Sequence, residues 1–454
     1  MINKLFSEFN PVSAKQWKQK IQFDIKGADY NDALVWATNE DISVKPFYHA
    51  DDFHELPNIS NTEATQWKIC QSIYVAHVEK SNLNAIDAIE RGAESIQFII
   101  STKDILIHDL IKNIDLDKVA VHLELQFLSE EFIKLIPNVA NIHVHYDIVN
   151  NLAKTGNWYT NLKDDFQQFE HLVKRTNSIT VDTTLYQNAG ATVVQQLAYG
   201  LAHANEYLNH LNNIIVSEAK QSLQITFKTS IGTNYFFEIA KLRALRTLWN
   251  SLASEYDVNP NCLIIATPTK RNKTIYDYNT NMLRTTTECM SAILGGANTI
   301  CNLPYDNIYH KTNEFGERIA RNQLLILKNE SYFDKVNNPA DGAYYIEILT
   351  KQLAEKALDL FKDIEANNGF LKQLKQGTIQ RKIKESAYKE QHLFDEGEEI
   401  LLGTNKHLNM SDKMKNELEI YPFVKTKQGK TLIEPILEKR LAEKIEQKRL
   451  KNEN

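Results

Sequence analysis

The sequence predicts an α/β protein whose main body is a closed (β/α)8 barrel, the TIM-barrel fold. Eight short runs rich in β-branched and aromatic residues follow one another between residues 67 and 303. Longer stretches with helical periodicity separate these runs. The runs are apolar almost throughout, which is typical of parallel strands covered by helices. Eight such units in series match the number that closes a barrel.

The predicted strands and helices alternate in order along the chain. The strands span residues 67–75, 95–101, 119–125, 141–149, 178–186, 223–231, 262–267 and 298–303. The helices between them span residues 83–91, 105–111, 130–135, 162–176, 191–211, 235–256 and 277–294. An open, doubly wound sheet would explain the same alternation. It would call for a G-x-G-x-x-G turn after its first strand, and the sequence contains no such motif.

The segments on either side of the barrel have a different character. Residues 1–60 hold large apolar groups between charges, and such a segment needs a surface other than itself to bury them. We expect an extended N-terminal arm over 1–60 that packs on its own barrel or wraps a partner chain. The barrel itself is expected over 61–315, a helical region packing on it over 316–410, and a polar C-terminal tail over 411–454. The aromatic and apolar residues of the arm are Trp17, Phe23, Ile25, Tyr30, Leu34 and Trp36.

Composition restricts the class of protein. The chain has 454 residues, with 24% charged and 43% hydrophobic, which excludes wholesale disorder. Its 52 basic and 58 acidic residues give a net charge of −6, so we expect no nucleic acid partner. No apolar run is long enough to span a bilayer, and the N-terminus lacks a secretory signal. With four cysteines that form no C-x-x-C pair, the sequence predicts a cytoplasmic protein without a membrane association.

Two clusters of polar residues are candidate sites. His143 and His145 share one face of a predicted strand and Asp147 continues the row, which suits either a metal site or hydrogen-bonded side chains inside a barrel. Because no third ligand stands at a recognisable spacing, the second interpretation is favoured and no metal is expected. Lys270-Arg271-Asn272-Lys273 follows a predicted strand, where a barrel binds anionic substrates, although a solvated loop is the favoured interpretation. From the residues alone, no active site is evident.

Several segments, taken in chain order, resemble the methylmalonyl-CoA mutase family of cobalamin-dependent acyl-CoA mutases, and in particular its small (β) subunits. The resemblance covers most of the chain between about residues 17 and 405. It implies a (β/α)8 substrate domain that threads coenzyme A along its axis, in agreement with the strand count. The matching segments are 24–30 (DIKGADY), 35–36 (VW), 44–48 (VKPFY), 187–191 (QNAGA), 238–249 (EIAKLRALRTLW), 318–322 (RIARN) and 338–347 (NPADGAYYIE).

The departures from the family pattern concern the residues that hold and activate the substrate. Catalytic members carry R-P-W-T-I-R-Q on the first barrel strand, but Thr65 and Cys70 occupy the two arginine positions here, while Trp67 and Gln71 are retained. Loss of both guanidinium groups removes bidentate recognition of carboxylate or phosphate. The resemblance therefore implies no catalytic or cofactor-binding residue on this strand.

The histidine that polarises the thioester carbonyl in catalytic members is also replaced. Leu185 stands at its position, two residues before Gln187, and has no side-chain donor. An H-T-N segment near the last strand becomes Cys301-Asn302-Leu303. We expect at most a vestigial pocket with Trp67, Gln71 and Gln187, and a barrel axis closed by apolar side chains such as Leu185 and Leu303.

Cobalamin-binding members carry a flavodoxin-like domain after the barrel, with a D-x-H-x-x-G loop that ligates cobalt. The chain ends at Asn454, about where that domain would begin, so none is expected. The fragment Asp52-Phe53-His54-Glu55-Leu56-Pro57 nearly spells the motif, but proline replaces its glycine and no βαβ pattern surrounds it. We interpret the fragment as a coincidence. Adenosylcobalamin is then expected on a large (α) partner subunit and not on this chain.

The leading hypothesis is a non-catalytic small subunit of an isomerase, a heterodimeric methylmalonyl-CoA mutase. Its large subunit would convert methylmalonyl-CoA to succinyl-CoA, and this chain would stabilise the complex. One alternative is an acyl-CoA mutase barrel that acts with a separate cobalamin-binding subunit, although such barrels keep the arginines and the histidine. Another is a regulatory acyl-CoA-binding protein that uses Lys270, Arg271 and Lys273 for the phosphates.

Overall fold

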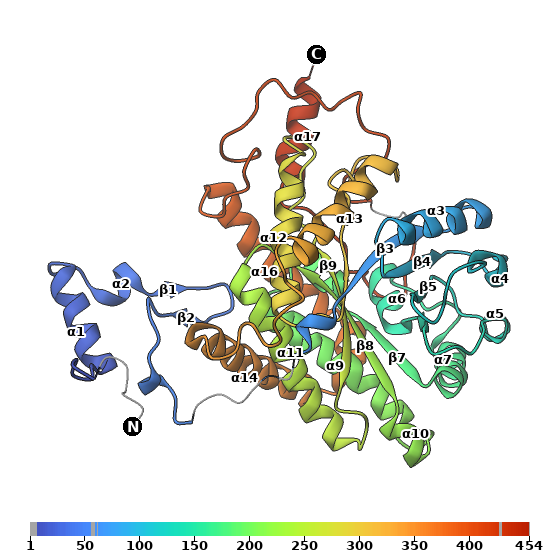
Figure 1. The fold of residues 1–454 in the computed structure, drawn as a ribbon, viewed down its shortest axis with the longest axis horizontal. Helices are drawn as coiled ribbons and strands as arrows, with labels where there is room; N and C mark the ends of the chain where they lie inside the picture. The colour runs from blue at the N-terminus through green and yellow to red at the C-terminus, as the bar shows by residue number, and fades with distance from the viewer. Residues whose placement is uncertain (1–6, 56–59, 61, 426–428, 454) are drawn as a thin grey trace.

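The computed structural model describes residues 7–55, 60, 62–425 and 429–453, and its body is an eight-stranded parallel barrel surrounded by helices (Figure 1). The (β/α)8 prediction is confirmed. Each predicted strand is present, with ends that differ by a few residues. The strands are β3 (Lys68–Tyr74), β4 (Ser95–Ile100), β5 (Ala120–Leu125), β6 (Ile142–His145), β7 (Ser178–Asp182), β8 (Gln224–Ile231), β9 (Cys262–Pro268) and β10 (Thr299–Cys301).

The barrel is nearly closed, with one seam between β6 and β7. The hydrogen-bonded order runs β6-β5-β4-β3-β10-β9-β8-β7, so β6 and β7 stand at its two ends. Side chains close the seam where the backbone ladder does not. His145 Nδ1 lies 2.9 Å from Thr180 Oγ1, and the Asp182 backbone N–H donates to Asp147 Oδ2 at 2.8 Å.

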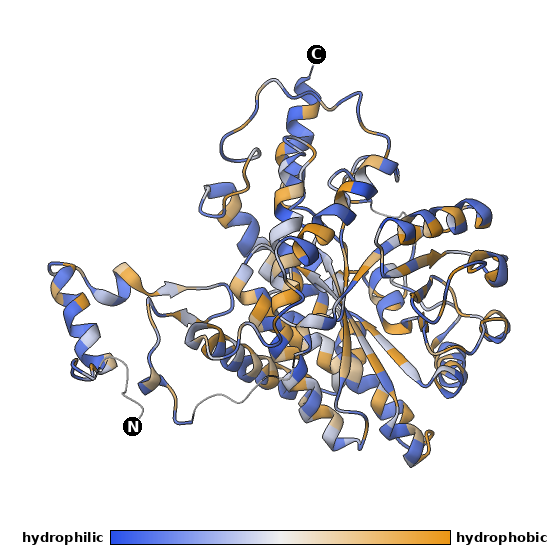
Figure 2. Ribbon diagram, in the orientation of Figure 1, coloured by the Kyte–Doolittle hydropathy of each residue, from blue (hydrophilic) through white to orange (hydrophobic). Residues whose placement is uncertain are grey.

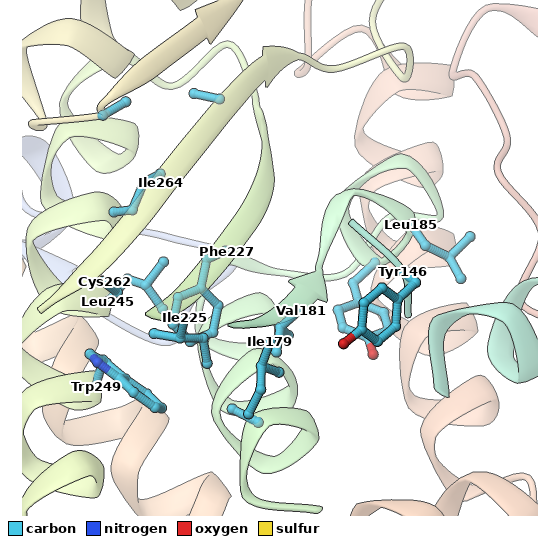
Figure 3. Packing of buried hydrophobic residues seen from close by; sticks show 14 of the residues in the cluster. Tyr146, Ile179, Val181, Leu185, Ile225, Phe227, Leu245, Trp249, Cys262 and Ile264 are labelled. Atoms are coloured by element: carbon cyan, nitrogen blue, oxygen red, sulfur yellow. The ribbon is translucent and has the colours of Figure 1, made fainter. Parts of the chain in front are cut away.

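Helices cover the outside of the barrel and pack their apolar faces on the strands. In Figure 2 these helices carry both hydrophilic and hydrophobic residues, as expected for elements with one exposed face. Figure 3 shows the buried layer, in which Phe227 of β8 meets Trp249 edge to face at 5.7 Å between ring centroids. The helices from β3 to β10 are α3 (Val78–Glu90), α4 (Ile107–Leu110), α5 (Glu130–Lys134), α6 (Ile148–Thr155), α7 (Leu162–Thr176), α8 (Thr184–Asn188), α9 (Val193–Leu211), α10 (Ser217–Gln221), α11 (Tyr235–Glu255) and α12 (Thr280–Leu294).

Two of the predicted strands are too long, and in each case the last residues belong to a helix. The strand predicted over 141–149 ends at His145, because Asp147 caps α6 by accepting a hydrogen bond from the Asn150 N–H at 2.7 Å. The strand predicted over 178–186 ends at Asp182, and α8 follows it. Ile148 and Leu185 are apolar because they are buried on helices, and a short apolar run does not distinguish the two cases.

The N-terminal segment projects from the barrel (Figure 1). It contains α1 (Ala14–Asp24), α2 (Tyr30–Leu34), the two-stranded ribbon β1 (Trp36–Ala37) and β2 (Ser43–Val44), and the 3-10 turns η1 (Ala50–Asp52) and η2 (Ala64–Gln66). Helix α1 buries none of its residues, although Trp17 stacks on Phe47 with 4.5 Å between ring centroids. The ribbon is anchored on the barrel, because Glu40 accepts hydrogen bonds from the N–H groups of Val193 and Val194 at 2.9 and 3.0 Å.

The C-terminal part is helical and then irregular. After β10 come α13 (Glu314–Asn329), α14 (Tyr344–Ala366), α15 (Gly369–Lys375), α16 (Thr378–Glu396) and α17 (Glu443–Asn452). Residues 433–441 form a strap over the loops at the C-terminal end of the barrel. In this strap the N–H groups of Ile433, Ile436, Lys439 and Leu441 donate to the carbonyl oxygens of Gly156, Ala153, Asn188 and Arg271, respectively.

Candidate functional site

The interior of the barrel is polar and is crossed by hydrogen bonds and ion pairs. Lys228 of β8 places Nζ 2.7 Å from Oε2 of Glu124 on β5, although these strands are not neighbours in the barrel. Such a contact must run through the interior. Glu124 also accepts from Gln97 Nε2 at 2.5 Å, and Gln97 Oε1 accepts from the thiol of Cys301 at 3.4 Å. This chain of contacts joins β8, β5, β4 and β10.

Lys228 is the positive charge at the centre of this network. Its Nζ also lies 3.3 Å from Oδ2 of Asp182. Burial favours the neutral amine, but the two carboxylates outweigh burial, and the pKa of Lys228 lies above its usual value. For Asp182, burial raises the pKa, whereas Lys228 and the hydrogen bonds from Thr184 lower it more, so the carboxyl stays ionised. The network is a buried salt bridge and not a free base or acid.

Three histidines fill the part of the interior next to the seam. His122 Nδ1 and His145 Nε2 are 2.9 Å apart, and the ring of His143 stacks on His122 at 5.0 Å between centroids. Burial lowers the pKa of His122 to about 3 and that of His145 well below its usual value, so both are neutral. Within the described ranges, no group of three His, Cys, Asp or Glu residues is arranged to hold a metal ion. The histidines therefore act as hydrogen-bonded barrel lining.

Asp147 does not join this row of histidines. It lies beyond the end of β6, where its Oδ1 accepts from the hydroxyl of Tyr207 at 2.7 Å and lies 3.0 Å from Nε2 of His203. His203 is fully buried, and its Nδ1 is 3.1 Å from the hydroxyl of Tyr186. This second network fixes α9 against the ends of β6 and β7.

Two cavities flank the seam and are separated by the same pair of residues. A cavity of about 260 Å³ opens near the carboxyl ends of β5 to β8 and is lined by Glu124, Asp182 and Lys228 among others. A cavity of about 320 Å³ lies toward the amino ends of β6 to β8, and its lining includes Thr226. His145 and Thr180 line both cavities, and their 2.9 Å contact stands between them.

The prediction that apolar side chains close the barrel axis is wrong, because polar side chains close it. The contacts that close the interior come from lysine, glutamate, glutamine, histidine and cysteine side chains. Leu185 is buried instead in the hydrophobic layer around the barrel (Figure 3), and Leu303 is half-buried just beyond the end of β10. The physical reason is the alternation of side chains along β7, where Thr180 and Asp182 face the interior. Ile179 and Val181 face the apolar layer, and Leu185, on α8 just beyond the strand, joins that layer.

The structure places Trp67, Gln71 and Gln187 in three different surroundings. Trp67 is fully buried at the start of β3, and its Nε1–H donates to the carbonyl of Phe333 at 3.3 Å. Gln71 accepts from Arg321 Nη1 of α13 at 3.2 Å, so it faces the helical layer. Gln187 lies at the other end of the barrel, on α8. The three residues do not converge on one pocket.

Gln187 belongs to a polar cluster beside the N-terminus of α9. Its Oε1 accepts a hydrogen bond from the buried Nζ of Lys241 at 2.9 Å, and Lys241 also donates to the Ser230 carbonyl at 2.7 Å. Lys241 is further paired with Glu238. Burial lowers the pKa of Lys241, although Glu238 opposes this effect.

Of the two residues expected at arginine positions from the resemblance, Cys70 is buried and lies directly opposite Cys301 in the barrel register. The hydroxyl of Thr65 is exposed and donates to Asn337 Oδ1 at 2.8 Å.

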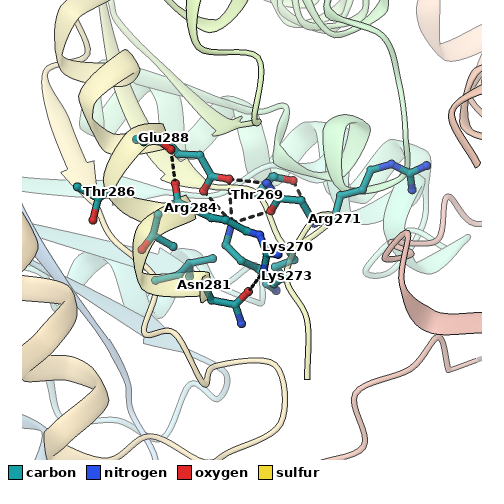
Figure 4. A network of polar contacts seen from close by, with 12 residues as sticks. Thr269, Lys270, Arg271, Lys273, Asn281, Arg284, Thr286 and Glu288 are labelled. Carbon is teal, nitrogen blue, oxygen red and sulfur yellow. Dashed lines mark hydrogen bonds and ion pairs between the residues drawn. The ribbon is translucent and has the colours of Figure 1, made fainter. Parts of the chain in front are cut away.

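The basic sequence at 270–273 is neutralised within the chain. Figure 4 shows Lys273, whose Nζ lies 2.7 Å from Glu288 Oε2, deep in the protein. Arg271 places Nε 2.5 Å from Glu390 and donates from Nη1 to the Lys439 carbonyl at 2.7 Å. Lys270 is half-exposed, 3.7 Å from Glu438. These side chains hold the strap and α12 in place and leave little positive charge for a phosphate. The contacts favour a structural role for the segment, as expected. The predicted solvated loop is wrong, however, because the loop is buried and ion-paired.

Sequence reasoning missed the central residues Gln97, Glu124 and Lys228. A signal exists, since polar residues alternate with apolar ones in β5 (AVHLEL) and β8 (QITFKTSI). Such alternation on a barrel strand means that one face points into the lumen.

The comparisons with known proteins agree with this architecture. The sequence profile described as "Methylmalonyl-CoA mutase" matches residues 143–452. A methylmalonyl-CoA mutase small subunit of Porphyromonas gingivalis is 34% identical over 444 residues, which cover 90% of this chain and 72% of that protein. A small subunit of Streptomyces virginiae is 28% identical, with 84% and 68% covered. A methylmalonyl-CoA mutase of Cereibacter sphaeroides is 29% identical, and the chain spans 64% of its length.

None of the helices in the described part of the chain combines the length and apolar character needed to cross a membrane. Three observations point to the same assignment. They are a barrel of the predicted class, a profile match over most of the chain, and a relative matched along nearly all of it. The chain belongs to the methylmalonyl-CoA mutase family.

Proposed function

We propose that the chain is the non-catalytic small subunit of a heterodimeric, adenosylcobalamin-dependent methylmalonyl-CoA mutase. The large subunit performs the isomerisation of methylmalonyl-CoA to succinyl-CoA, and this chain stabilises the complex. The names of two relatives, both small subunits, support this assignment.

The observation that carries the proposal is the filled barrel interior. A coenzyme A thioester that ran along the axis would have to displace the contacts of Lys228 with Glu124 and of His145 with Thr180. Separating the first pair would leave Glu124 without its cation, and breaking a buried ion pair costs several kcal/mol in general. The interior thus favours a structural barrel over a substrate channel.

The side chains expected to act on a thioester also favour a non-catalytic chain. Leu185 offers no donor to a carbonyl oxygen and is buried in an apolar layer. Neutral His122 and His145 bond to each other, and Lys228 is held between carboxylates. No residue of this set is both free and aimed at a space that would hold a substrate.

The described residues do not fit cobalamin. A lower-ligand loop would require a second parallel sheet, whereas the described sheets are the barrel and the two-stranded β1–β2 ribbon. His54, from the fragment that resembles the cobalt-ligating motif, is exposed in the arm. We therefore assign the cofactor to the large subunit and derive no chemical step through it in this chain.

The arm of residues 7–55 is our candidate for the interface with the large subunit. Trp17 and Phe23 are 47% and 79% exposed, and helix α1 buries nothing against the barrel. Exposed aromatic groups on a projecting segment are typical of interfaces, in which aromatics carry much of the binding free energy.

The test is to purify the chain alone and together with the cognate large subunit. We expect the isolated chain to show no isomerisation with added adenosylcobalamin, and to co-elute with the large subunit in size-exclusion chromatography. Turnover above the protein-free background by the isolated chain, or failure to form the complex, would overturn the proposal. Calorimetry with a coenzyme A thioester should detect no micromolar binding to this chain.

A further inference from the structure

Two of the four cysteines face each other inside the barrel. Cys70 of β3 and Cys301 of β10 are directly opposed in the parallel register of these neighbouring strands. Neighbouring strands lie about 4.8 Å apart, and disulfides bridge Cα atoms separated by roughly 4.4 to 6.8 Å. Residues directly opposite each other on paired strands point to the same face of the sheet, so both thiols lie on the interior side. The register therefore brings the two Cα atoms into the range of separations that a disulfide can bridge.

The other two cysteines offer an internal comparison. Cys262 and Cys289 are as buried as Cys70 and Cys301, but they belong to the hydrophobic layer between the strands and the helices. Cys301 instead belongs to the polar interior, where its thiol donates to Gln97 Oε1 at 3.4 Å. Burial is thus common to all four thiols, whereas a second cysteine directly opposite on the neighbouring strand distinguishes Cys70 and Cys301.

A row of hydrogen-bonded polar side chains links an open cavity to this pair. The cavity of about 260 Å³ at the carboxyl ends of the strands is lined by Glu124. Glu124 accepts from Gln97, and Gln97 accepts from Cys301. A hydroperoxide as small as hydrogen peroxide, which has only two heavy atoms and hydrogen-bonds as water does, can follow this row of polar groups when the side chains fluctuate.

We propose that Cys70 and Cys301 form a redox modification site, which a small hydroperoxide converts to an intrachain disulfide. One thiol attacks a peroxide oxygen, so the O–O bond breaks, a sulfenic acid forms and one water leaves. The second thiol attacks the sulfenic sulfur, so the S–S bond forms, the S–O bond breaks and a second water leaves. The two sulfur atoms together lose two electrons, and one hydrogen peroxide is reduced to two waters.

The surroundings also set the speed of the reaction. The contact with Cys70 and burial raise the pKa of Cys301 well above its usual value. Because the thiolate is the attacking form, oxidation should be slow at neutral pH and faster at alkaline pH. The product removes the hydrogen that Cys301 donates to Gln97 and ties β3 to β10 covalently.

The test uses the folded full-length chain and millimolar hydrogen peroxide. After quenching, free thiols are alkylated in denaturant and the chain is analysed by intact mass and by peptide mapping. We expect two of the four thiols to be lost, so that the alkylated chain carries two labels in place of four and, after the labels are subtracted, is lighter by two hydrogens. Peptide mapping should give one linked pair of peptides carrying Cys70 and Cys301. Four alkylated thiols, or a linkage through Cys262 or Cys289, would overturn the proposal.

Matched variants separate this site from general oxidation. Cys262→Ser and Cys289→Ser should give the same linked peptides as the wild-type chain, whereas Cys70→Ser and Cys301→Ser should give none. Circular dichroism establishes that each variant is folded, and Cys70→Ala provides a second substitution should serine in the interior disturb the barrel. A disulfide that forms only after the chain is unfolded in urea would contradict the role assigned to the native register.

Discussion

Replacing Lys228 by methionine should destabilise the barrel strongly, because it leaves the largely buried Asp182 and the part-buried Glu124 without their cation. The Nζ atom lies 2.7 Å from Glu124 and 3.3 Å from Asp182, and the Lys228 side chain is 10% exposed. At an effective dielectric constant of about 20, the gross attraction of the two pairs is ~6 and ~5 kcal/mol. Desolvation of the charges offsets much of this, and removal of one partner of a buried pair typically costs about 3–5 kcal/mol.

We therefore expect the free energy of unfolding of Lys228→Met to fall by about 3–5 kcal/mol in urea titrations at neutral pH. The matched control is Lys118→Met, whose partner Asp115 is an exposed surface residue, and it should leave the unfolding midpoint unchanged. Combining Lys228→Met with Glu124→Gln should recover part of the loss, because one stranded charge is removed. Equal midpoints for Lys228→Met and the control would refute the argument that this ion pair holds the interior together.

The pH dependence of the wild-type chain offers a second readout of the same pair. Because the folded pKa of Lys228 is raised, its contribution to stability is complete below its unfolded pKa of about 10.4 and is lost at higher pH. Unfolding midpoints should fall above that pH in the wild-type chain, and Lys228→Met should lack this component.

Three further predictions concern the arm, the histidines and the ribbon. Trp17→Ala combined with Phe23→Ala should abolish co-elution with the large subunit and leave the circular dichroism spectrum unchanged, whereas Tyr332→Ala, which removes an exposed aromatic elsewhere, should do neither. Because the folded pKa values of His122 and His145 are lowered, stability should fall as the pH decreases from ~6.5 toward ~3, by at most ~1.4 kcal/mol per pH unit for each ring. An unchanged slope in His122→Gln would contradict this. Glu40→Ala should cost about 1 kcal/mol and speed proteolysis of the ribbon, and Glu40→Gln should cost less.

The order of strands and helices could be predicted because buried parallel strands and amphipathic helices leave strong local patterns. The interior could not, because it depends on which residues meet across the barrel. Lys228 and Glu124 are 104 positions apart in the chain, and nothing local says that they pair. Leu185 illustrates an error about an apolar residue. It was expected in the barrel axis, but it belongs to α8 and lies in the apolar layer outside the strands.

The resemblance to the family led us to expect that residues of the substrate site are replaced, but it did not predict what surrounds the replacing residues. Thr65 and Cys70 were expected at arginine positions, yet Thr65 is half-buried and bonded to Asn337, and Cys70 faces Cys301. Side-chain direction at the start of a strand depends on pairing register, which a single sequence does not specify.

The strap of residues 433–441 has a consequence for how the chain matures during synthesis. Its contacts reach Ala153 and Gly156 in and after α6 on one side of the seam, and Asn188 after α8 on the other. A nascent chain has all eight strands once Cys301 has been made, but the segment that fastens the two sides of the seam emerges much later. Until then, the seam is closed by contacts such as those of His145 with Thr180 and of Asp147 with the Asp182 backbone. Messages truncated before the strap should therefore yield barrels that are recognised by chaperones or proteases, even though every strand is present.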